Sequence, residues 1–450
     1  MTKENNKASS DNRRQAINNQ SILQSTNKDD HIFRVLSVLN ENISRSNSLH
    51  HEFLKGQSLA IHTMSPEIRL SKVSNQSKSK QKPFISKSQL REFGTGSIAK
   101  CFGPDFAILD HRRSPRIPNG DLLMIDRIIS ITGERKVLKP PASIVSEFDV
   151  PDNAWFLQEN KYTGLPLSIL MEIALQPCGI LSAYLGTSLE LPAEINRFRN
   201  LDGEITFHDC PDLSGRTITN HAAFLKSFSS SGMHIQEYTF ELSVDASVFL
   251  AGESSFGYFS QEAMEQQTGL GYRENPNLAS KSRTVKTHQD QNREDAITLQ
   301  ANSLQSKHLS LVDSVRFYEN TGKYSKGIVR GEKRLRGNEW FYDNHFFQDP
   351  VMPGSLGLEA VMQGLWAFVR HQRYDVKFSN PVLDFAGNDP FVWKYRGQVI
   401  PSNHLINYQI HLKEVQVFDS IIFISADADF QVDGTRIYAF KNIAFALREG

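Results

Sequence analysis

Residues 344–359 have the sequence Asn344-His-Phe-Phe-Gln-Asp-Pro-Val-Met-Pro-Gly-Ser-Leu-Gly-Leu-Glu359. In this stretch a histidine precedes a Pro-Gly pair that can begin a helix, and a carboxylate follows inside that helix. Each residue also has a simpler use, because a lone histidine beside two phenylalanines is more often structural than catalytic. Likewise, Glu359 could be a buried acid with satisfied hydrogen bonds, and Pro353-Gly354 could be only a turn.

Together, these residues suit the β-elimination of water. His345 titrates near neutrality and can remove a weakly acidic proton next to a carbonyl group. Backbone N–H groups near Gly354, at a helix N-terminus, can stabilise the negative charge that develops on the carbonyl oxygen. A carboxyl group inside an apolar helix tends to have a raised pKa and can protonate a leaving hydroxyl group.

Parts of this region are repeated earlier in the chain, at near-constant offsets of 187, 185 and 187 residues. The repeat predicts a duplication, in which two segments share a strand, a Trp-Phe loop, a Pro-introduced helix and several later strands. The matching features are Asp126 and Asp313, Trp155-Phe156 and Trp340-Phe341, and Glu172-x-x-x-Gln176 and Glu359-x-x-x-Gln363.

The duplication predicts an α+β fold of two fused halves, each an antiparallel sheet wrapped around a long helix. We expect the helices to begin near Ser168 and Ser355, and a hairpin turn at Asp433-Gly434. The first half is expected at 93–261 and the second at 307–450, joined by a polar linker at 262–306.

Residues 1–92 are rich in Ser, Asn, Gln and Lys, so we expect a mostly disordered tail. Within it, apolar residues recur at partly helical spacing between 32 and 59. This pattern could form a docking helix or only a marginal helix in a linker.

The composition excludes some classes of partner and site. The 50 acidic and 50 basic side chains balance, so the net charge gives no reason to expect nucleic acid. The long apolar run at 165–186 contains Glu172, Gln176 and Pro177, which favours a buried helix over a membrane span. The cysteines are few and have no CxxC spacing, which argues against a zinc site and favours a reducing cytoplasm; they are Cys101, Cys178 and Cys210.

From His345 to Glu359 the sequence resembles the active-site segment of FabA/FabZ-type 3-hydroxyacyl-acyl carrier protein dehydratases, almost residue for residue. Two further stretches, Asp110–Asp121 and Ser168–Gly179, look like the dehydratase units of polyunsaturated fatty acid synthases and related polyketide-type lipid synthases, the PfaC type. Supporting matches lie at Leu122–Arg127, Trp340-Phe341, Tyr395–Pro401, Val432–Gly434 and Ile437-Tyr438.

The resemblance implies a double hot-dog fold in which the His of one half faces the carboxylate on the helix of the other. It therefore implies a site with His345 as base, Glu172 as acid and the Gly354 N–H as the donor to the thioester oxygen. Asn160 stands where the first half would need its histidine, and Asn cannot act as a base. The pseudo-symmetric site, with Asn160 and Glu359, should therefore be inactive. Four residues are assigned to substrate binding, namely Gln176, Pro353, Phe346 and Glu359.

The implied reaction converts a (3R)-hydroxyacyl thioester to a trans-2-enoyl thioester and water, with no metal or organic cofactor. The substrate would arrive on the phosphopantetheine arm of an acyl carrier protein that works with a multienzyme synthase. The chain would be a monomeric pseudo-dimer or a homodimer. FabA-type enzymes carry Asp where this chain has Glu, so isomerisation of the product is left open, as is the choice between Glu172 and Glu359 as the acid. A hot-dog thioesterase and a non-catalytic acyl-thioester binding module are the alternatives.

Overall fold

The computed structural model describes residues 82–230, 233–271, 295–297, 307–387 and 389–450. By its contacts the chain divides into two units, 1–81 and 82–450, and the described residues belong to the second. The helix predicted between 32 and 59 lies outside the described residues.

The folded unit begins before the predicted boundary at residue 93. A short strand, β1 (Ile85–Ser86), is followed by α2 (Lys87–Thr95), which spans that boundary and starts with a capping box. Ile85 and Leu90 are buried in the core. The residues from 82 onward therefore pack with the first half, because their apolar side chains complete its core.

The first half contains the predicted long helix and a run of strands. Its helices are α3 (Ile98–Phe102), η1 (Pro104–His111), η2 (Gly120–Leu122), α4 (Trp155–Gln158), α5 (Leu167–Tyr184) and α6 (Thr187–Glu190). Its strands are β2 (Arg127–Thr132), β3 (Ala142–Asp149), β4 (Ile195–Phe207), β5 (Thr217–Ser230), β6 (Met233–Val244) and β7 (Ser247–Ser260).

The second half repeats this order. Its helices are α9 (Phe341–Asn344), α10 (Gly354–His371) and η4 (Asp375–Lys377). Its strands are β9 (Ser314–Tyr318), β10 (Ile328–Arg334), β11 (Pro381–Phe385), β12 (Phe391–Tyr395), β13 (Leu405–Val417), β14 (Ile421–Val432) and β15 (Thr435–Glu449). The predicted linker is not wholly without structure, since α7 (Gln261–Glu265) and β8 (Asp295–Ile297) lie within or across it.

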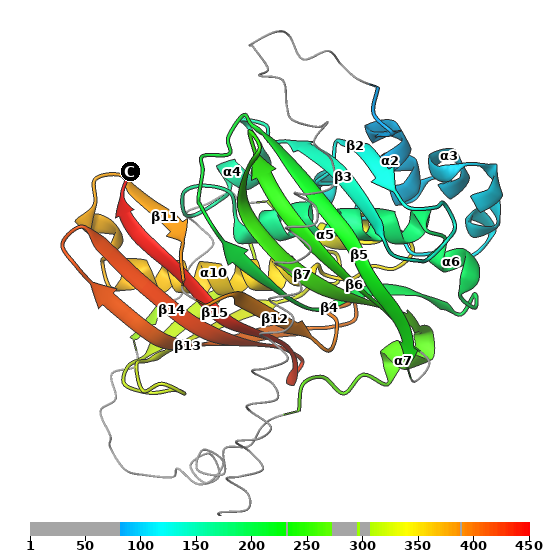
Figure 1. The fold of residues 1–450 in the computed structure, drawn as a ribbon. Coiled ribbons are helices and arrows are strands. Elements are labelled where there is room, and N and C mark those ends of the chain that lie inside the picture. Colours follow the sequence, from blue (N-terminus) through cyan, green and yellow to red (C-terminus); the bar gives the residue numbers. More distant parts are fainter. Residues whose placement is uncertain (1–81, 231–232, 272–294, 298–306, 388) are drawn as a thin grey trace, which may run out of the picture. The chain divides into compact units, whose positions relative to one another are not determined.

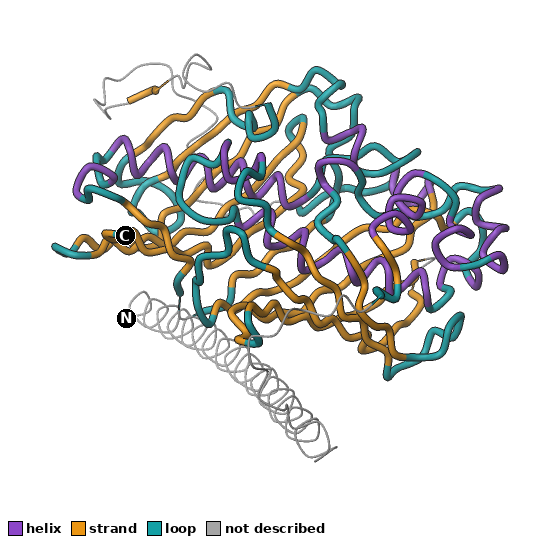
Figure 2. Tube along the Cα trace, turned by 90° about the horizontal axis from the view of Figure 1, so that it is seen from above, coloured by secondary structure: helices purple, strands orange, loops and turns teal. Residues whose placement is uncertain are grey.

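The strand order confirms the predicted double hot-dog arrangement. The first half runs β2-β3-β5-β6-β7-β4 and the second runs β9-β10-β13-β14-β15-β12, with antiparallel neighbours throughout. The two series join where β4 pairs with β12, which makes one continuous sheet. Figure 1 shows this sheet with α5 and α10 lying against it, one in each half. Seen from above, the helices cross the middle of the unit among the strands (Figure 2).

Matching hairpins set the register in both halves. Asp433 and Gly434 both have positive φ angles, as the predicted type I′ turn requires, and Val432 pairs with Thr435 across it. In the first half the turn at Asp245-Ala246 also has two positive φ angles, and Val244 pairs with Ser247. Residues of β15 therefore correspond to residues of β7 at an offset of 188.

The two long helices begin where the sequence predicted. Proline precedes each one, at Pro166 before α5 and at Pro353 before α10. Among the described residues, α5 is the helix that is long and apolar enough to cross a membrane, but 78% of that segment is buried within the fold. The prediction of a buried core helix is therefore confirmed.

Trp393 is the largest fully buried side chain where the two halves meet. Its indole Nε1–H donates a 2.6 Å hydrogen bond to Asn200 Oδ1 of β4. A β-carbon on Gly203 would lie 2.2 Å from the indole ring, so the opposite strand must have glycine there. The two halves are thus joined by the pairing of β4 with β12 and by one closely packed aromatic side chain, Trp393.

Replacing Trp393 by alanine should lower the free energy of unfolding by about 3–5 kcal/mol, because it leaves a cavity and removes the donor to Asn200 Oδ1. Urea denaturation followed by circular dichroism measures this change. The Val376→Ala variant is the control, since that side chain is 63% exposed and its loss should cost less than about 0.5 kcal/mol. Equal stability of the two variants would contradict this account of how the halves are joined.

Candidate active site

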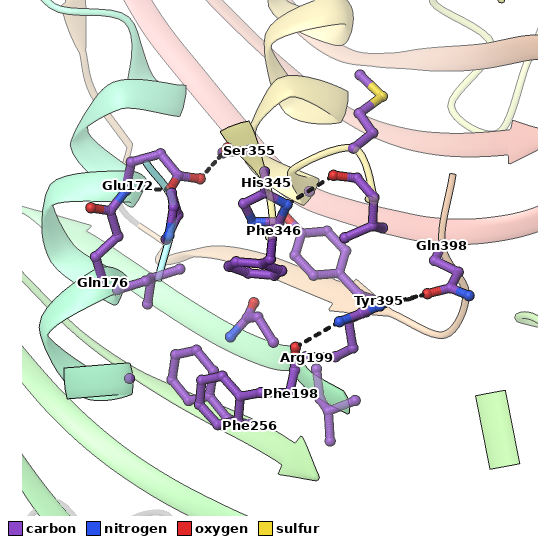
Figure 3. A pocket seen from close by; sticks show the side chains of 18 of the residues that line it. Glu172, Gln176, Phe198, Arg199, Phe256, His345, Phe346, Ser355, Tyr395 and Gln398 are labelled. Carbon is purple, nitrogen blue, oxygen red and sulfur yellow. Dashed lines mark hydrogen bonds between the residues drawn. The ribbon is translucent and has the colours of Figure 1, made fainter. Parts of the chain in front are cut away.

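A pocket at the junction of the two halves contains most of the predicted site residues. It holds about 930 Å³ of space not filled by atoms, part of it open to solvent. In Figure 3, Glu172 on α5 and His345 beside the start of α10 border the same space. We call it the His345 pocket; its lining includes Met171, Glu172, Leu175, Gln176, Phe198 and Phe256 from the first half, and His345, Phe346, Gly354, Ser355, Tyr395 and Tyr438 from the second.

One backbone hydrogen bond fixes the tautomer and orientation of His345. Its Nδ1 lies 2.8 Å from the carbonyl oxygen of Val351. A carbonyl oxygen can only accept, so Nδ1 carries the proton and Nε2 keeps its lone pair. Burial lowers the pKa of His345 to about 3. The ring is therefore neutral near pH 7 and can accept a proton through Nε2.

The loop that carries His345 is held by arginines of the first half. Asp349 accepts two hydrogen bonds from the Arg199 guanidinium, at 2.8 and 3.0 Å. Arg113 lies 3.0 Å and Arg197 3.5 Å from the same carboxylate. Since three cations converge on one anion, the loop is tied across the junction.

Glu172 is held at the pocket wall by two side chains. The Ser355 hydroxyl donates a 2.6 Å hydrogen bond to its Oε1, and Gln176 Nε2 donates one of 2.8 Å to its Oε2. Burial raises the pKa of Glu172, an effect that these two donors oppose. Gln176 is fixed in turn by the Leu122 carbonyl and the Met124 N–H. The carboxyl group therefore has a fixed position and an increased tendency to stay protonated.

Gly354 is the first residue of α10, so its N–H has no acceptor within the helix. A β-carbon at this position would lie 2.6 Å from the ring of Tyr395, which excludes any larger residue. The glycine therefore lets the helix N-terminus approach the pocket closely.

The structure places Gln176 and Phe346 in the lining, but it does not place Pro353 or Glu359 there. Pro353 is the buried residue that precedes α10. Glu359 is 1% exposed and accepts hydrogen bonds from Tyr162 and Ser168, while burial raises its pKa to about 7. Neither residue lines this pocket, and their assignment to substrate binding stays a prediction.

The pseudo-symmetric counterpart of the pocket, which we call the twin site, is largely filled. Asn160 donates to the Gly164 carbonyl and does not line the cavity that remains there. The remaining cavity holds about 370 Å³ of unfilled space. Its lining includes Leu167, at the position equivalent to Gly354, and the rings of Phe207 and Phe385, stacked with centroids 5.0 Å apart.

Sequence reasoning missed Ser355 as a ligand of Glu172 and the three arginines on Asp349, and it named Tyr395 only as part of a family match. The acidic residue inside the 344–359 stretch was the available signal for the arginines. Its partners lie about 150 residues away or more, so spacing could not reveal them. Among the described residues, no group of three or more His, Cys, Asp or Glu side chains is arranged to hold a metal ion.

Comparison with known proteins agrees with the sequence resemblance. Residues 304–441 match the model of the FabA-like domain. The chain is also 31% identical over 388 residues, 80% of its length, to one of the subunits of the polyunsaturated fatty acid synthase of Thraustochytrium sp.. It spans only 26% of that relative.

Solved structures show more distant likenesses. A protein described as an oleoyl thioesterase from Lactobacillus plantarum is 10% identical, with a TM-score of 0.39, and the match covers 69% of this chain and 98% of the other. A chain of the dehydratase heterocomplex ApeI:P from Xenorhabdus doucetiae is 12% identical, with a TM-score of 0.26, and the match covers 34% and 91%. Likenesses at this level say nothing about activity. The family match and the sequence relative, in contrast, show that residues 304–441 resemble a FabA-like domain and that the chain is similar to part of a polyunsaturated fatty acid synthase.

Proposed function

We propose that the chain is a (3R)-hydroxyacyl-thioester dehydratase that releases water and leaves a trans-2-enoyl thioester. One observation carries this proposal: a histidine that can accept a proton through Nε2 and a buried carboxyl group with a raised pKa, from different halves, share a single pocket with a helix N-terminus. The FabA-like domain match supports the same reaction class.

In the proposed reaction, His345 Nε2 takes a proton from C2 of the acyl chain. The electron pair of that C–H bond forms the C2–C3 double bond, and the C3–O bond breaks as Glu172 donates its proton to the hydroxyl group. Water leaves, and the Gly354 N–H stabilises the negative charge on the thioester oxygen. The proton taken by His345 must later return to Glu172 through solvent.

Burial prepares both groups for these roles. His345 is neutral above about pH 3, and Glu172 stays protonated up to its raised pKa. Between these two values the base is unprotonated and the acid is protonated, as the reaction requires. Activity should therefore decline as the pH rises through the pKa of Glu172.

The substrate would be carried on the phosphopantetheine arm of an acyl carrier protein, as part of a multienzyme lipid synthase in the cytoplasm. The synthase relative supports this assignment. The proposed chemistry needs no metal or organic cofactor, since proton transfer and hydrogen bonding suffice. One chain supplies both halves of the site, so a monomeric pseudo-dimer would be active.

The apolar wall of the pocket indicates where the acyl chain lies. Met171, Leu175 and Gly179 recur every four residues along α5 and line the pocket, opposite Phe198. A β-carbon on Gly179 would already touch the Phe198 ring at 3.5 Å, so a larger side chain at this lining position would project into the pocket. The equivalent helix position in the second half, at an offset of 187, is Trp366. Its ring centroid lies 6.3 Å from that of Tyr162. The acyl chain would therefore extend past Gly179 into the first half.

A thioesterase would need a carboxylate that activates water. Glu172 suits this role poorly, because burial favours its protonated form. A non-catalytic binding module would not need an oriented base. Release of free thiol from an acyl thioester distinguishes the thioesterase, and absence of any turnover identifies the binding module.

Replacing His345 by alanine should reduce kcat about 10²–10⁴-fold, because the general base is lost. Dehydration of a 3-hydroxydecanoyl-pantetheine thioester, followed by the absorbance of the enoyl product, measures the loss. His404→Ala is the control, since His404 is exposed and lies outside the pocket. Turnover retained in the His345 variant would refute the proposed function.

Separate replacement of the two glutamates by glutamine tests which one is the acid. Glu172→Gln should abolish most activity because it removes the donated proton, while Ser355 and Gln176 can still contact the amide. Glu359→Gln should leave kcat within about twofold, because Glu359 does not line the His345 pocket. The reverse pattern in the same assay would show that the acid was assigned to the wrong half.

Gly179→Trp should shorten the acyl chain that the pocket accepts. It gives the His345 pocket the same bulky side chain that Trp366 provides at the equivalent position of the second half. We expect kcat/KM for the 3-hydroxydecanoyl thioester to fall more than about tenfold. The 3-hydroxybutyryl thioester serves as the internal control, because it ends before Gly179 and should be turned over nearly as fast. An equal loss for both substrates would mean that the acyl chain takes another path.

A further inference from the structure

We propose that Tyr395 is a further catalytic residue, whose hydroxyl group donates a hydrogen bond to the thioester carbonyl oxygen beside the Gly354 N–H. This inference rests on the proposed dehydratase function and names a second donor in the same site.

The Tyr395 hydroxyl is buried without a hydrogen-bond partner, although its residue lines the His345 pocket. The side chain is only 6% exposed. Burying a hydroxyl group without a partner costs free energy, and phenylalanine would avoid that cost in a purely structural position. A ligand oxygen in the pocket would supply the missing acceptor.

The Tyr395 ring is fixed by its neighbours. Its centroid lies 4.5 Å from that of Tyr438 and 6.1 Å from that of Phe440, with both pairs near edge-to-face. The backbone is also held, because Tyr395 pairs with Tyr438 of β15 and the preceding Lys394 pairs with Asp202 of β4. The hydroxyl therefore has a set position before any ligand binds.

Tyr395 and the start of α10 form one wall of the pocket. A β-carbon on Gly354 would lie 2.6 Å from the ring and 3.0 Å from the hydroxyl oxygen. The glycine N–H and the tyrosine O–H thus lie close enough to donate to a single oxygen atom between them. Figure 3 shows Tyr395 on the same side of the pocket as His345.

The twin site lacks this hydroxyl. Tyr395 pairs with Tyr438 on β15, and the corresponding residue of β7, at the offset of 188 set by the hairpins, is Leu250. Leu250 pairs with Phe207, so phenylalanine occupies the position equivalent to Tyr395. The filled site therefore lacks the base, the glycine and the hydroxyl together, as expected if the three serve one reaction.

The chemistry requires a donor that remains protonated. As C2 loses its proton, negative charge grows on the thioester oxygen, where two donors stabilise it better than one. Burial raises the pKa of Tyr395 well above its usual range, so the hydroxyl keeps its proton at any pH at which the site works.

Tyr395→Phe tests the proposal by removing only the hydroxyl group. We expect kcat for the 3-hydroxydecanoyl-pantetheine thioester to fall about 10- to 100-fold with KM nearly unchanged, since the donor acts mainly on the developing charge. Tyr408→Phe is a matched control, because the Tyr408 hydroxyl is also buried without a partner but lies outside the pocket. That variant should retain wild-type kcat.

Infrared spectroscopy gives a second measurement that a structural role would not change. The carbonyl stretch of a ¹³C-labelled thioester bound to His345→Ala should shift to higher frequency in His345→Ala/Tyr395→Phe, because one hydrogen bond to the carbonyl is lost. Unchanged frequency, or unchanged kcat in Tyr395→Phe, would overturn the assignment of Tyr395. These outcomes differ from failure of the proposed function, in which the wild-type protein itself would show no dehydration.

Discussion

The pairing of β4 with β12 is the constraint on which the rest of the structure depends. Phe391 pairs with Ile205 and Trp393 with Gly203, so the two sheets become one and the halves are related about that seam. With the sheets fixed in this way, α5 and α10 pack against each other, and Glu172 comes to face the start of α10. Without the seam, the base and the acid would belong to separate surfaces.

The same burial has opposite effects on the two titratable groups of the pocket. It lowers the pKa of His345 and raises that of Glu172, because both changes favour the neutral form. Neither group carries a charge into the apolar junction, so the site avoids the large cost of burying an ion. The charges that do approach it are those of Asp349 and its three arginines, whose ion pairs hold the histidine loop in place.

The duplication has been used asymmetrically. Four equivalent positions differ in a way that opens one site and fills the other. The pairs are His345 and Asn160, Gly354 and Leu167, Tyr395 and Phe207, and Gly179 and Trp366. The first half no longer provides a base, but it contributes the acid, the arginines and the wall along α5. The half without a histidine is therefore part of the site, since the pocket needs it for shape and for a proton.

The sequence alone determined the local features and the duplication. The 344–359 stretch, the repeat offsets and the prolines before Leu167 and Gly354 predicted two helices and their starts, because helix starts and hydrophobic patterns depend on neighbouring residues. The site shared between the halves was implied by the resemblance to FabA/FabZ-type dehydratases. Only the tertiary structure decided which groups meet. Ser355 reaches Glu172 across 183 residues, and Arg199 reaches Asp349 across 150. Contacts at such separations leave no periodic pattern in a sequence, and whether a hydroxyl such as that of Tyr395 lacks a partner depends on every atom packed around it.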